Sequence, residues 1–366
     1  MPFSKTKKIS QWITLVERPI ELEDNTSYQL VTVRRGFAGV ESRGIFKGKE
    51  IKVKNYFLVQ AGDFLISKRQ IAHGACGIVP ESLDGAVVSN EYNVFVPQKE
   101  TNIEFFFLIM QLPYYKRLFY LMSDGVHIEK LLFKTNDWMK RSLSLPPLPE
   151  QQKIATILST QDKVIELKEK LLVQKQQQKK YLMQQLLTGK KRLSGFNEKW
   201  RFAKLENVSK YSASAASFKT YESHLGCGPY PVYDASGCFG NIDFYENEQP
   251  YISIVKDGAG AGRVALCKEK SSTIGTLGCI FANDIDLLYL FYCMSAVDFQ
   301  IYSNGSTIPH VYYKDYKNMV LYLPCELEQK AIVEILSAAD HEIDLLQKSI
   351  EAEKQKKKAL MQLLLT

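Results

Sequence analysis

The sequence has few of the features that would place it in a membrane or outside the cell. It contains no run of about 18 uncharged apolar residues, so we expect no membrane span. Residues 1–11 are basic and polar and include no apolar stretch of the kind that forms the core of a signal peptide. We therefore expect the chain to stay in the cytoplasm, without a membrane partner.

Cysteine pairs suited to zinc are also missing. The seven cysteines form no Cys-x-x-Cys motif, and most of them fall inside apolar runs. Structural zinc sites use closely spaced pairs of cysteine or histidine ligands. We expect buried, free thiols in a reducing compartment and no metal in this chain.

The motifs of several catalytic classes are absent. No Gly-x-x-x-x-Gly-Lys-[Ser/Thr] loop occurs, which argues against a P-loop ATPase. A methyltransferase would need a glycine-rich cofactor loop and an Asn/Asp-Pro-Pro-aromatic motif, but the only double proline, Pro146–Pro147, lies between leucines. The five histidines do not have metal-ligand spacing. We therefore predict no catalytic residue and no cofactor bound by this chain.

Positive charge is concentrated in the first half of the sequence. Residues 1–149 carry 20 basic and 15 acidic side chains, and residues 150–193 carry 10 and 4. Residues 194–324 carry 11 and 13, and residues 325–366 carry 6 and 8. The basic half suits a polyanionic partner. Because the other half is net acidic, charge alone does not identify that partner.

An internal repeat organises the chain. Residues 145–188 align without a gap to residues 323–366, at an offset of 178. Both copies have prolines only near their start and are then rich in helix-favouring Gln, Lys, Leu and Glu. Gly189 follows the first copy at the place of a C-cap. Each copy is predicted to form one helix of about 60 Å, at about 1.5 Å per residue.

The apolar residues of both copies follow a heptad period. The resulting seams are apolar at the ends and polar near the middle. We predict that the two copies pack on each other as an antiparallel coiled coil, with pairing to an outside partner as the alternative. The seam residues expected to form this spacer are Ile154, Leu158, Ile165, Leu172, Leu182, Leu186, Ile332, Leu336, Ile343, Leu346, Ile350, Leu360 and Leu364.

The segments before the two long helices share one plan. Strand-like runs are followed by an aromatic helix, a Ser-Asp/Asn-Gly turn and a last strand. In the first segment the runs cover 56–67 and 86–96, and the helix covers about 102–122. In the second segment the runs cover 251–255, 263–267 and 274–281, and the helix covers about 284–302. Two unlike units on one scaffold predict a target of two unlike DNA words at a fixed spacing, by analogy with symmetric DNA-binding dimers.

These motifs resemble those of specificity subunits of type I restriction–modification systems. LPPLPEQQKIATIL and LPCELEQKAIVEIL are similar to the helical regions of that family, and KKYLMQQLLTGKKRL resembles the exit from the first of its helices. YISIVKDGAGAGRV and SNGSTIPHVYYKDYKNMVLYLP resemble parts of its target-recognition domains, and GDFLISKRQ and SDGVHIEKLLFK occupy the matching places in the first half. The resemblance covers essentially the whole chain.

The resemblance implies a DNA-binding subunit without catalytic activity. Such a subunit binds two modification subunits, which carry the adenine methyltransferase chemistry and use S-adenosylmethionine, and restriction subunits join that core. Each recognition domain would bind one half of a bipartite, asymmetric site on double-stranded DNA, and the helix pair would set the gap.

The expected fold is therefore α+β, with two mixed α/β target-recognition domains alternating with two long helices. The first recognition domain is predicted at 1–147 and the first spacer helix at 148–190. The second recognition domain is predicted at 191–324 and the second spacer helix at 325–366.

Candidate DNA contacts in the first domain are basic and amide side chains near predicted turns. Such side chains can donate to phosphates or to base edges, although plain solvated loops are the alternative for each. The candidates are Arg34, Arg35, Arg43, Lys47, Lys52, Lys54, Lys68, Arg69 and Gln70.

In the second domain the glycine-rich segment 256–263 is predicted to be a turn that lets the backbone approach phosphate. A structural hairpin is the alternative, and a dinucleotide-binding loop is disfavoured because no helix follows the glycines. The candidates in this domain are Lys256, Gly260, Arg263, Ser271, Ser272, Thr273, Thr276, Ser306, Thr307 and His310.

Other functions remain open at this point. The chain could be the specificity part of a related system that cuts on both sides of its site. It could instead be a coiled-coil scaffold that binds only protein, which predicts no DNA binding even with its partner present. An orphan or truncated copy used in phase variation is a third alternative.

Overall fold

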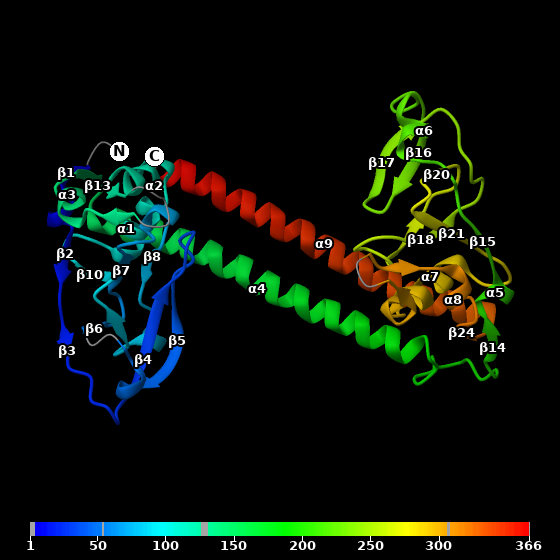
Figure 1. The fold of residues 1–366 in the computed structure, drawn as a ribbon, viewed down its shortest axis with the longest axis horizontal. Helices are drawn as coiled ribbons and strands as arrows, with labels where there is room; N and C mark the ends of the chain where they lie inside the picture. The colour runs from blue at the N-terminus through cyan, green and yellow to red at the C-terminus, as the bar shows by residue number, and fades with distance from the viewer. Residues whose placement is uncertain (1–3, 53–54, 126–130, 306–307, 366) are drawn as a thin grey trace. The chain divides into compact units, whose positions relative to one another are not determined.

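The computed structural model describes residues 4–52, 55–125, 131–305 and 308–365, and it divides into two compact units. The first unit comprises Met1–Glu166 and Ala352–Thr366, and the second comprises Leu167–Glu351. Each unit contains an α/β globule together with part of both long helices, α4 (Leu148–Leu186) and α9 (Glu326–Leu365) (Figure 1).

The first globule is built on a four-stranded antiparallel sheet with the order β2-β10-β7-β8. These strands are β2 (Ile13–Val16), β10 (Tyr92–Pro97), β7 (Phe64–Ser67) and β8 (Cys76–Ile78). A two-stranded ladder brackets the globule, and a short hairpin precedes the ladder's last strand. The ladder is β1 (Lys5–Lys8) with β13 (Ser142–Leu145), and the hairpin is β11 (Ser123–Asp124) with β12 (Leu132–Phe133).

The second globule repeats this plan strand for strand. Its sheet has the order β15-β21-β18-β19, with β15 (Ser209–Ser212), β21 (Leu277–Ala282), β18 (Tyr251–Val255) and β19 (Val264–Cys267). Its ladder is β14 (Arg201–Lys204) with β24 (Val320–Leu323), and its hairpin is β22 (Ser303–Asn304) with β23 (His310–Val311). The prediction of one plan used twice is thus confirmed.

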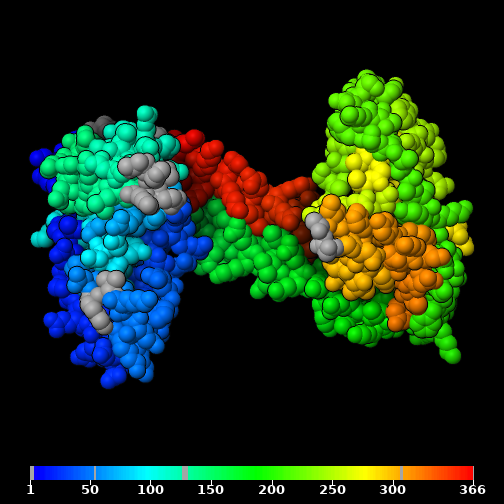
Figure 2. Space-filling view, in the orientation of Figure 1, coloured from blue at the N-terminus to red at the C-terminus, as the bar shows by residue number. Residues whose placement is uncertain are grey.

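The two globules differ in a second sheet that the sequence patterns did not predict. The first globule adds a five-stranded sheet, β3 (Pro19–Ile20), β6 (Tyr56–Leu58), β9 (Val87–Ser89), β4 (Ser27–Val33) and β5 (Val40–Lys47). The second adds only three strands, β17 (Gly237–Ile242), β16 (Tyr230–Asp234) and β20 (Ser272–Thr273). Strand β5 is mostly exposed, and the blue β4–β5 segment forms surface of the first globule in Figure 2.

The predicted aromatic helices are shorter than expected. The first is two helices, α1 (Ile103–Met110) and α2 (Pro113–Leu121), because Pro113 has no N–H to continue a helix and stands at the start of α2 instead. The second is α7 (Leu287–Ser295), followed by a 3-10 turn over Phe299–Tyr302. The remaining short helices are α3 (Thr135–Met139), α5 (Leu205–Val208), α6 (Phe218–Glu222) and α8 (Tyr313–Tyr316).

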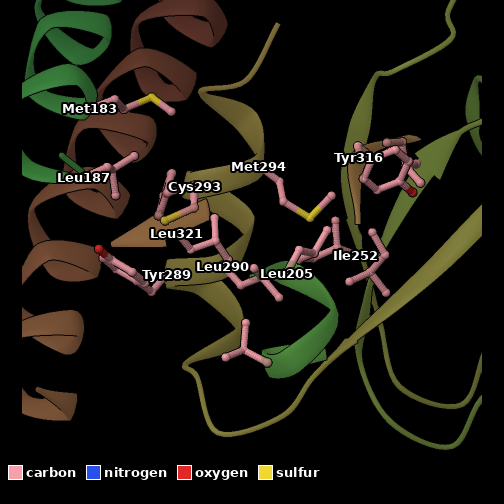
Figure 3. Packing of buried hydrophobic residues seen from close by; sticks show 14 of the residues in the cluster. Met183, Leu187, Leu205, Ile252, Tyr289, Leu290, Cys293, Met294, Tyr316 and Leu321 are labelled. Atoms are coloured by element: carbon pink, nitrogen blue, oxygen red, sulfur yellow. The ribbon is translucent and has the colours of Figure 1, made fainter. Parts of the chain in front are cut away.

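Each globule has an aromatic core that the long helices complete. In the first unit Trp138 is fully buried among phenylalanines, and Ile154 and Leu158 from the start of α4 join the same cluster with Leu365 from the end of α9. In the second unit the end of α4 supplies Met183, and Leu187 follows directly after the helix. These face α7, which contributes Tyr289, Leu290, Cys293 and Met294 (Figure 3).

The same glutamine of the repeat anchors each long helix to its globule. Gln151 is fully buried, donates to the Pro146 carbonyl at 2.8 Å and accepts from the backbone N–H of the N-cap residue of α1 at 3.0 Å. Gln329 donates to the Pro324 carbonyl at 3.0 Å and accepts from the N-cap residue of α7 at 3.0 Å. A buried amide needs such partners, which explains why this polar residue recurs in an apolar setting.

The long helices pack antiparallel, as predicted. In the first unit the start of α4 meets the end of α9, where Gln161 donates to the Glu353 carboxylate at 2.8 Å. In the second unit the end of α4 meets the start of α9, where Lys175 pairs with Glu342 at 2.7 Å. All predicted spacer residues are buried or half-buried.

Two ion pairs of the helices are related by the repeat. Lys357 pairs with Asp162 at 2.5 Å in the first unit, and Lys179 pairs with Asp340 in the second. Lys179 and Lys357 occupy the same position of the repeat, as do Asp162 and Asp340. The polar middle of the predicted seam therefore forms matched cross-helix pairs, which define one register of the antiparallel pair.

Within the described residues no helix is both long and apolar enough to cross a bilayer. The expectation of buried thiols is only partly correct, because Cys227 and Cys238 are exposed. Burial raises the pKa of the Cys293 thiol to about 12 and that of Cys279 to about 11.

Candidate nucleic-acid interface

The two loops singled out in the sequence occupy the same place in the two globules. Lys68 directly follows β7, and Lys256 directly follows its counterpart β18. The Lys68 carbonyl accepts from Phe133 of β12 at 2.9 Å, and the Lys256 carbonyl accepts from Val311 of β23 at 2.8 Å. Each loop is therefore fastened to the small hairpin of its own globule in the same way.

In the first globule the two basic side chains of the loop after β7 are engaged by the segment at residues 90–91. Arg69 is exposed and pairs with Glu91 at 2.6 Å, and the Lys68 ammonium donates to the Asn90 carbonyl at 2.6 Å. Gln70 is half-buried. Gly74 closes the loop with φ of 75°, and a Cβ there would lie 2.8 Å from the Phe37 ring, so glycine fits both conformation and space.

In the second globule residues 256–263 form a tight connection between β18 and β19. Gly258 and Gly262 have φ values of 93° and 88°, and a Cβ on Gly262 would lie 2.4 Å from that of Phe299. Arg263 is exposed and donates to the Ala235 carbonyl. A strand follows the glycines, which agrees with the rejection of a dinucleotide-binding loop.

His310 joins this second loop from the neighbouring hairpin. Its Nδ1 lies 2.7 Å from the Asp257 carboxylate, and both side chains are about one third exposed. The backbone N–H of Gly258 donates to the Pro309 carbonyl at 3.0 Å. His310 is thus brought to the loop that carries Lys256, Gly260 and Arg263, although it is distant from them in the sequence.

Several candidates from the sequence are not available to a ligand. Ser271, Ser272 and Thr273 are fully buried, the last two in β20, so their candidacy as DNA contacts is not supported by the structure. Thr276 is half-buried, and its carbonyl accepts from the Lys256 N–H at 2.9 Å. The Ser/Thr composition resembled an exposed loop, but Ser272 and Thr273 form a strand of the second sheet.

The basic stretch of the first globule lies on and beside the β4–β5 hairpin. Arg34, Arg35, Arg43, Lys47 and Lys52 are all exposed, and Arg34 pairs with Glu41 at 3.4 Å. These residues are accessible for phosphate contact, but they are separate in sequence from the loop after β7. Three further candidates lie outside the described residues, namely Lys54, Ser306 and Thr307.

A groove that sequence reasoning missed lies beside Lys68. It has a volume of about 720 Å³ and is lined by Asn93, Lys134, Asn136 and Lys140, among others. Lys134 pairs with Asp124 of the hairpin, and this carboxylate raises the pKa of its ammonium group. The segment KTNDWMKR could have indicated this groove from the sequence, because it combines amide and basic side chains, which suit DNA contact, with a short helix.

The described residues contain no group of three or more His, Cys, Asp or Glu side chains placed to hold a metal ion. A polar cluster, formed by Arg192, Glu328 and Trp200, joins the second globule to α9. Arg192 Nε lies 2.8 Å from the fully buried Glu328 carboxylate, which also accepts from Trp200 Nε1 at 2.9 Å. These contacts hold the start of the second globule against α9, which is a structural role.

Known proteins share both the fold and the internal duplication of this chain. A model of the family described as "Type I restriction modification DNA specificity domain" matches residues 14–176 and again 197–354. The putative type I restriction enzyme MjaX specificity subunit of Methanocaldococcus jannaschii is 28% identical over 249 residues, which are 61% of this chain and 58% of that protein. The MjaVIII specificity subunit of the same organism is 37% identical over 131 residues, 34% of this chain and 30% of that protein. Both matches span less than two thirds of the relative's length.

Solved structures support the same architecture. The S subunit of a type I restriction–modification system from M. genitalium is similar with a TM-score of 0.65 and 14% identity, covering 99% of this chain and 96% of that chain. The HsdS subunit from Thermoanaerobacter tengcongensis is similar with a TM-score of 0.51 and 16% identity, covering 100% and 97%. At these identities the likeness shows the fold, whereas the family model covers most of the sequence in two copies. The chain belongs to the type I restriction–modification DNA specificity family, as a specificity subunit with two recognition domains.

Proposed function

We propose that the chain gives a type I restriction–modification complex its DNA sequence specificity by binding a bipartite, asymmetric target on double-stranded DNA. The observation that carries this proposal is the duplicated recognition fold, in which equivalent loops after β7 and β18 sit on globules of unlike sequence and unlike second sheet. Two loops at equivalent places can contact equivalent positions on the DNA backbone. Their unlike side chains can then recognise unlike base sequences.

The partners that we propose follow the family. Two modification subunits would supply adenine methylation with S-adenosylmethionine, and restriction subunits would complete the complex. This chain would bind no cofactor of its own and would act in the cytoplasm, where the DNA is. The two related halves of the helix pair, with matched ion pairs Lys357–Asp162 and Lys179–Asp340, offer two similar places for two copies of one partner.

Expressing the chain with its cognate modification subunit should create one new methylated motif, made of two unlike short words separated by unspecified bases. Genome-wide methylation mapping measures this directly. Omitting this chain is the control and should abolish the motif. A continuous palindrome, or no new methylation with a modification subunit of proven activity, would contradict the proposal.

Replacing the Lys256 ammonium with an uncharged chain of similar length should weaken DNA binding by the complex. In Lys256→Met we expect the slope of log affinity against log salt concentration to fall by about 1, as for loss of one phosphate contact. The measurement is a titration of DNA at several salt concentrations. Lys199→Met, which changes an exposed lysine outside the loops, is the matched control. Equal slopes for both variants and the unchanged complex would remove Lys256 from the interface.

A further inference from the structure

A cavity of about 250 Å³ lies in the first unit between α1, the start of α4 and the end of α9. Leu108 of α1 lines it, together with Ser159 and Asp162 of α4 and Lys357 of α9. Its volume is below the 300–1,000 Å³ or so that is typical of pockets for drug-sized ligands. A cavity of this size suits a single ring.

The second unit shows what fills the equivalent space there. Asn102 and Asp286 are the N-caps of α1 and α7, and each accepts from the third residue of its helix through its side chain. Counting from these caps, Leu108 in the first unit corresponds to Tyr292 in the second. Leu108 is half-buried, whereas Tyr292 is only 3% exposed.

Tyr292 makes three polar contacts with the long helices. Its hydroxyl donates to the Asp340 carboxylate at 2.8 Å and lies 3.2 Å from the Ser337 hydroxyl. The Lys179 ammonium lies 5.5 Å from the centre of its ring, within the range of a cation–π contact.

All three contact residues recur in the wall of the first unit's cavity. At the repeat offset of 178, Ser337 corresponds to Ser159, Asp340 to Asp162, and Lys179 to Lys357. The first unit therefore keeps the hydroxyl, the carboxylate and the ammonium that hold a phenol ring in the second unit. It has no ring at the matching position, because leucine stands in the place of tyrosine.

We propose that this cavity is a binding site for the phenol ring of a tyrosine side chain presented by a partner subunit. This inference rests on the proposed function, because it takes the chain to be assembled with other subunits. The ring lies beside Leu108 and Phe107, its hydroxyl donates to Asp162, and the ammonium of Lys357 faces the ring. Tyrosine suits such a place because its apolar ring and its polar tip are both satisfied.

The first test uses p-cresol, the side-chain analogue of tyrosine, with the full chain. We expect ligand-observed NMR to detect binding, and a crystal soaked with p-cresol to show the ring beside Leu108. Toluene, which lacks the hydroxyl, should bind several-fold more weakly. Leu108→Tyr should fill the cavity from within and abolish the signal. No binding of p-cresol, or equal binding to Leu108→Tyr, would overturn the proposal.

A reciprocal variant guards against misfolding of Leu108→Tyr. Tyr292→Leu should open the matching cavity in the second unit, so that p-cresol raises the melting temperature of this variant more than that of the unchanged chain. An equal rise in both would show that the ring does not recognise the shared Ser, Asp and Lys set.

The second test addresses the source of the ring. Leu108→Tyr should weaken assembly with the modification subunit by about tenfold or more, as when a buried aromatic anchor is lost from an interface. Unchanged assembly would overturn the assignment to that partner's tyrosine. Methylation of the split target by the unchanged chain tests the proposed function separately, so the two failures can be distinguished.

Discussion

Deleting one heptad from each long helix is expected to shorten the unspecified gap of the methylated target by about three base pairs while leaving both words unchanged. Seven residues span about 10.5 Å of helix, and stacked base pairs rise about 3.4 Å each. A whole heptad keeps the seam in phase to within about 20°, so the remaining seam residues still face each other.

The structure indicates which heptads to delete. Residues 168–174 and 346–352 are equivalent in the repeat and lie near the middle of the two helices. Their removal deletes the contact of Lys168 with Ser349 but leaves the ion pairs Lys357–Asp162 and Lys179–Asp340 in place. The shortened chain therefore keeps the pairs that define the register.

Methylation mapping with the modification subunit measures the outcome. Deleting only 168–174 is the matched control, and it should abolish methylation because the two helices no longer match in length. Changed words in the double deletion would show that the helices affect recognition itself. An unchanged gap would show that they do not set the spacing.

Truncating Trp138 is expected to destabilise the first unit by about 3–5 kcal/mol, the usual cost of removing a large aromatic side chain from a core. Trp138 is fully buried, and four phenylalanine rings surround it with centroid distances from 5.6 to 6.5 Å. Urea denaturation of Trp138→Ala, with hydrogen exchange to assign the transition to residues 4–166, measures the loss.

Two further variants make this test specific. Tyr114→Ala removes a ring that is 68% exposed in the same unit, and it should change stability by no more than about 0.5 kcal/mol. Trp138→Phe should cost less than Trp138→Ala, because it keeps an aromatic ring and removes an indole N–H that finds no hydrogen-bond partner among the described residues. Equal destabilisation by Trp138→Ala and Tyr114→Ala would contradict the assigned core.

The helices and their pairing could be predicted because their information is local and repeated. A heptad period over about 40 residues, present twice at one offset, leaves few arrangements for Ile154, Leu158 and their counterparts. The same local logic placed strand β18 at Tyr251–Val255, where the run is fully buried. The prediction of one continuous helix was wrong at Pro113. Aromatic residues continue on both sides of this proline, and their pattern favoured a single helix although the proline interrupts it.

The second sheets and the groove beside Lys68 depend on pairing between distant segments. Strand β4 pairs in parallel with β9, and β16 pairs in parallel with β20. Parallel strands are not joined by a tight hairpin turn, so the sequence contains no local turn motif that would predict these pairs. Ser272 and Thr273 therefore looked like an exposed polar loop although they are buried in a strand. The cavity beside Leu108 could not be predicted either, because side chains of α1, α4 and α9 that are far apart in the sequence form its wall together.

Each globule begins and ends on one antiparallel ladder, so that Lys5 lies opposite Leu145 and Arg201 lies opposite Leu323. Residues between the two strands of a ladder can change in number without moving the point at which the chain passes into the next long helix. The five-stranded and three-stranded second sheets are two such interiors of different size. A globule of this kind behaves as an interchangeable insert, because its interior can differ while its two ends stay paired at the same place.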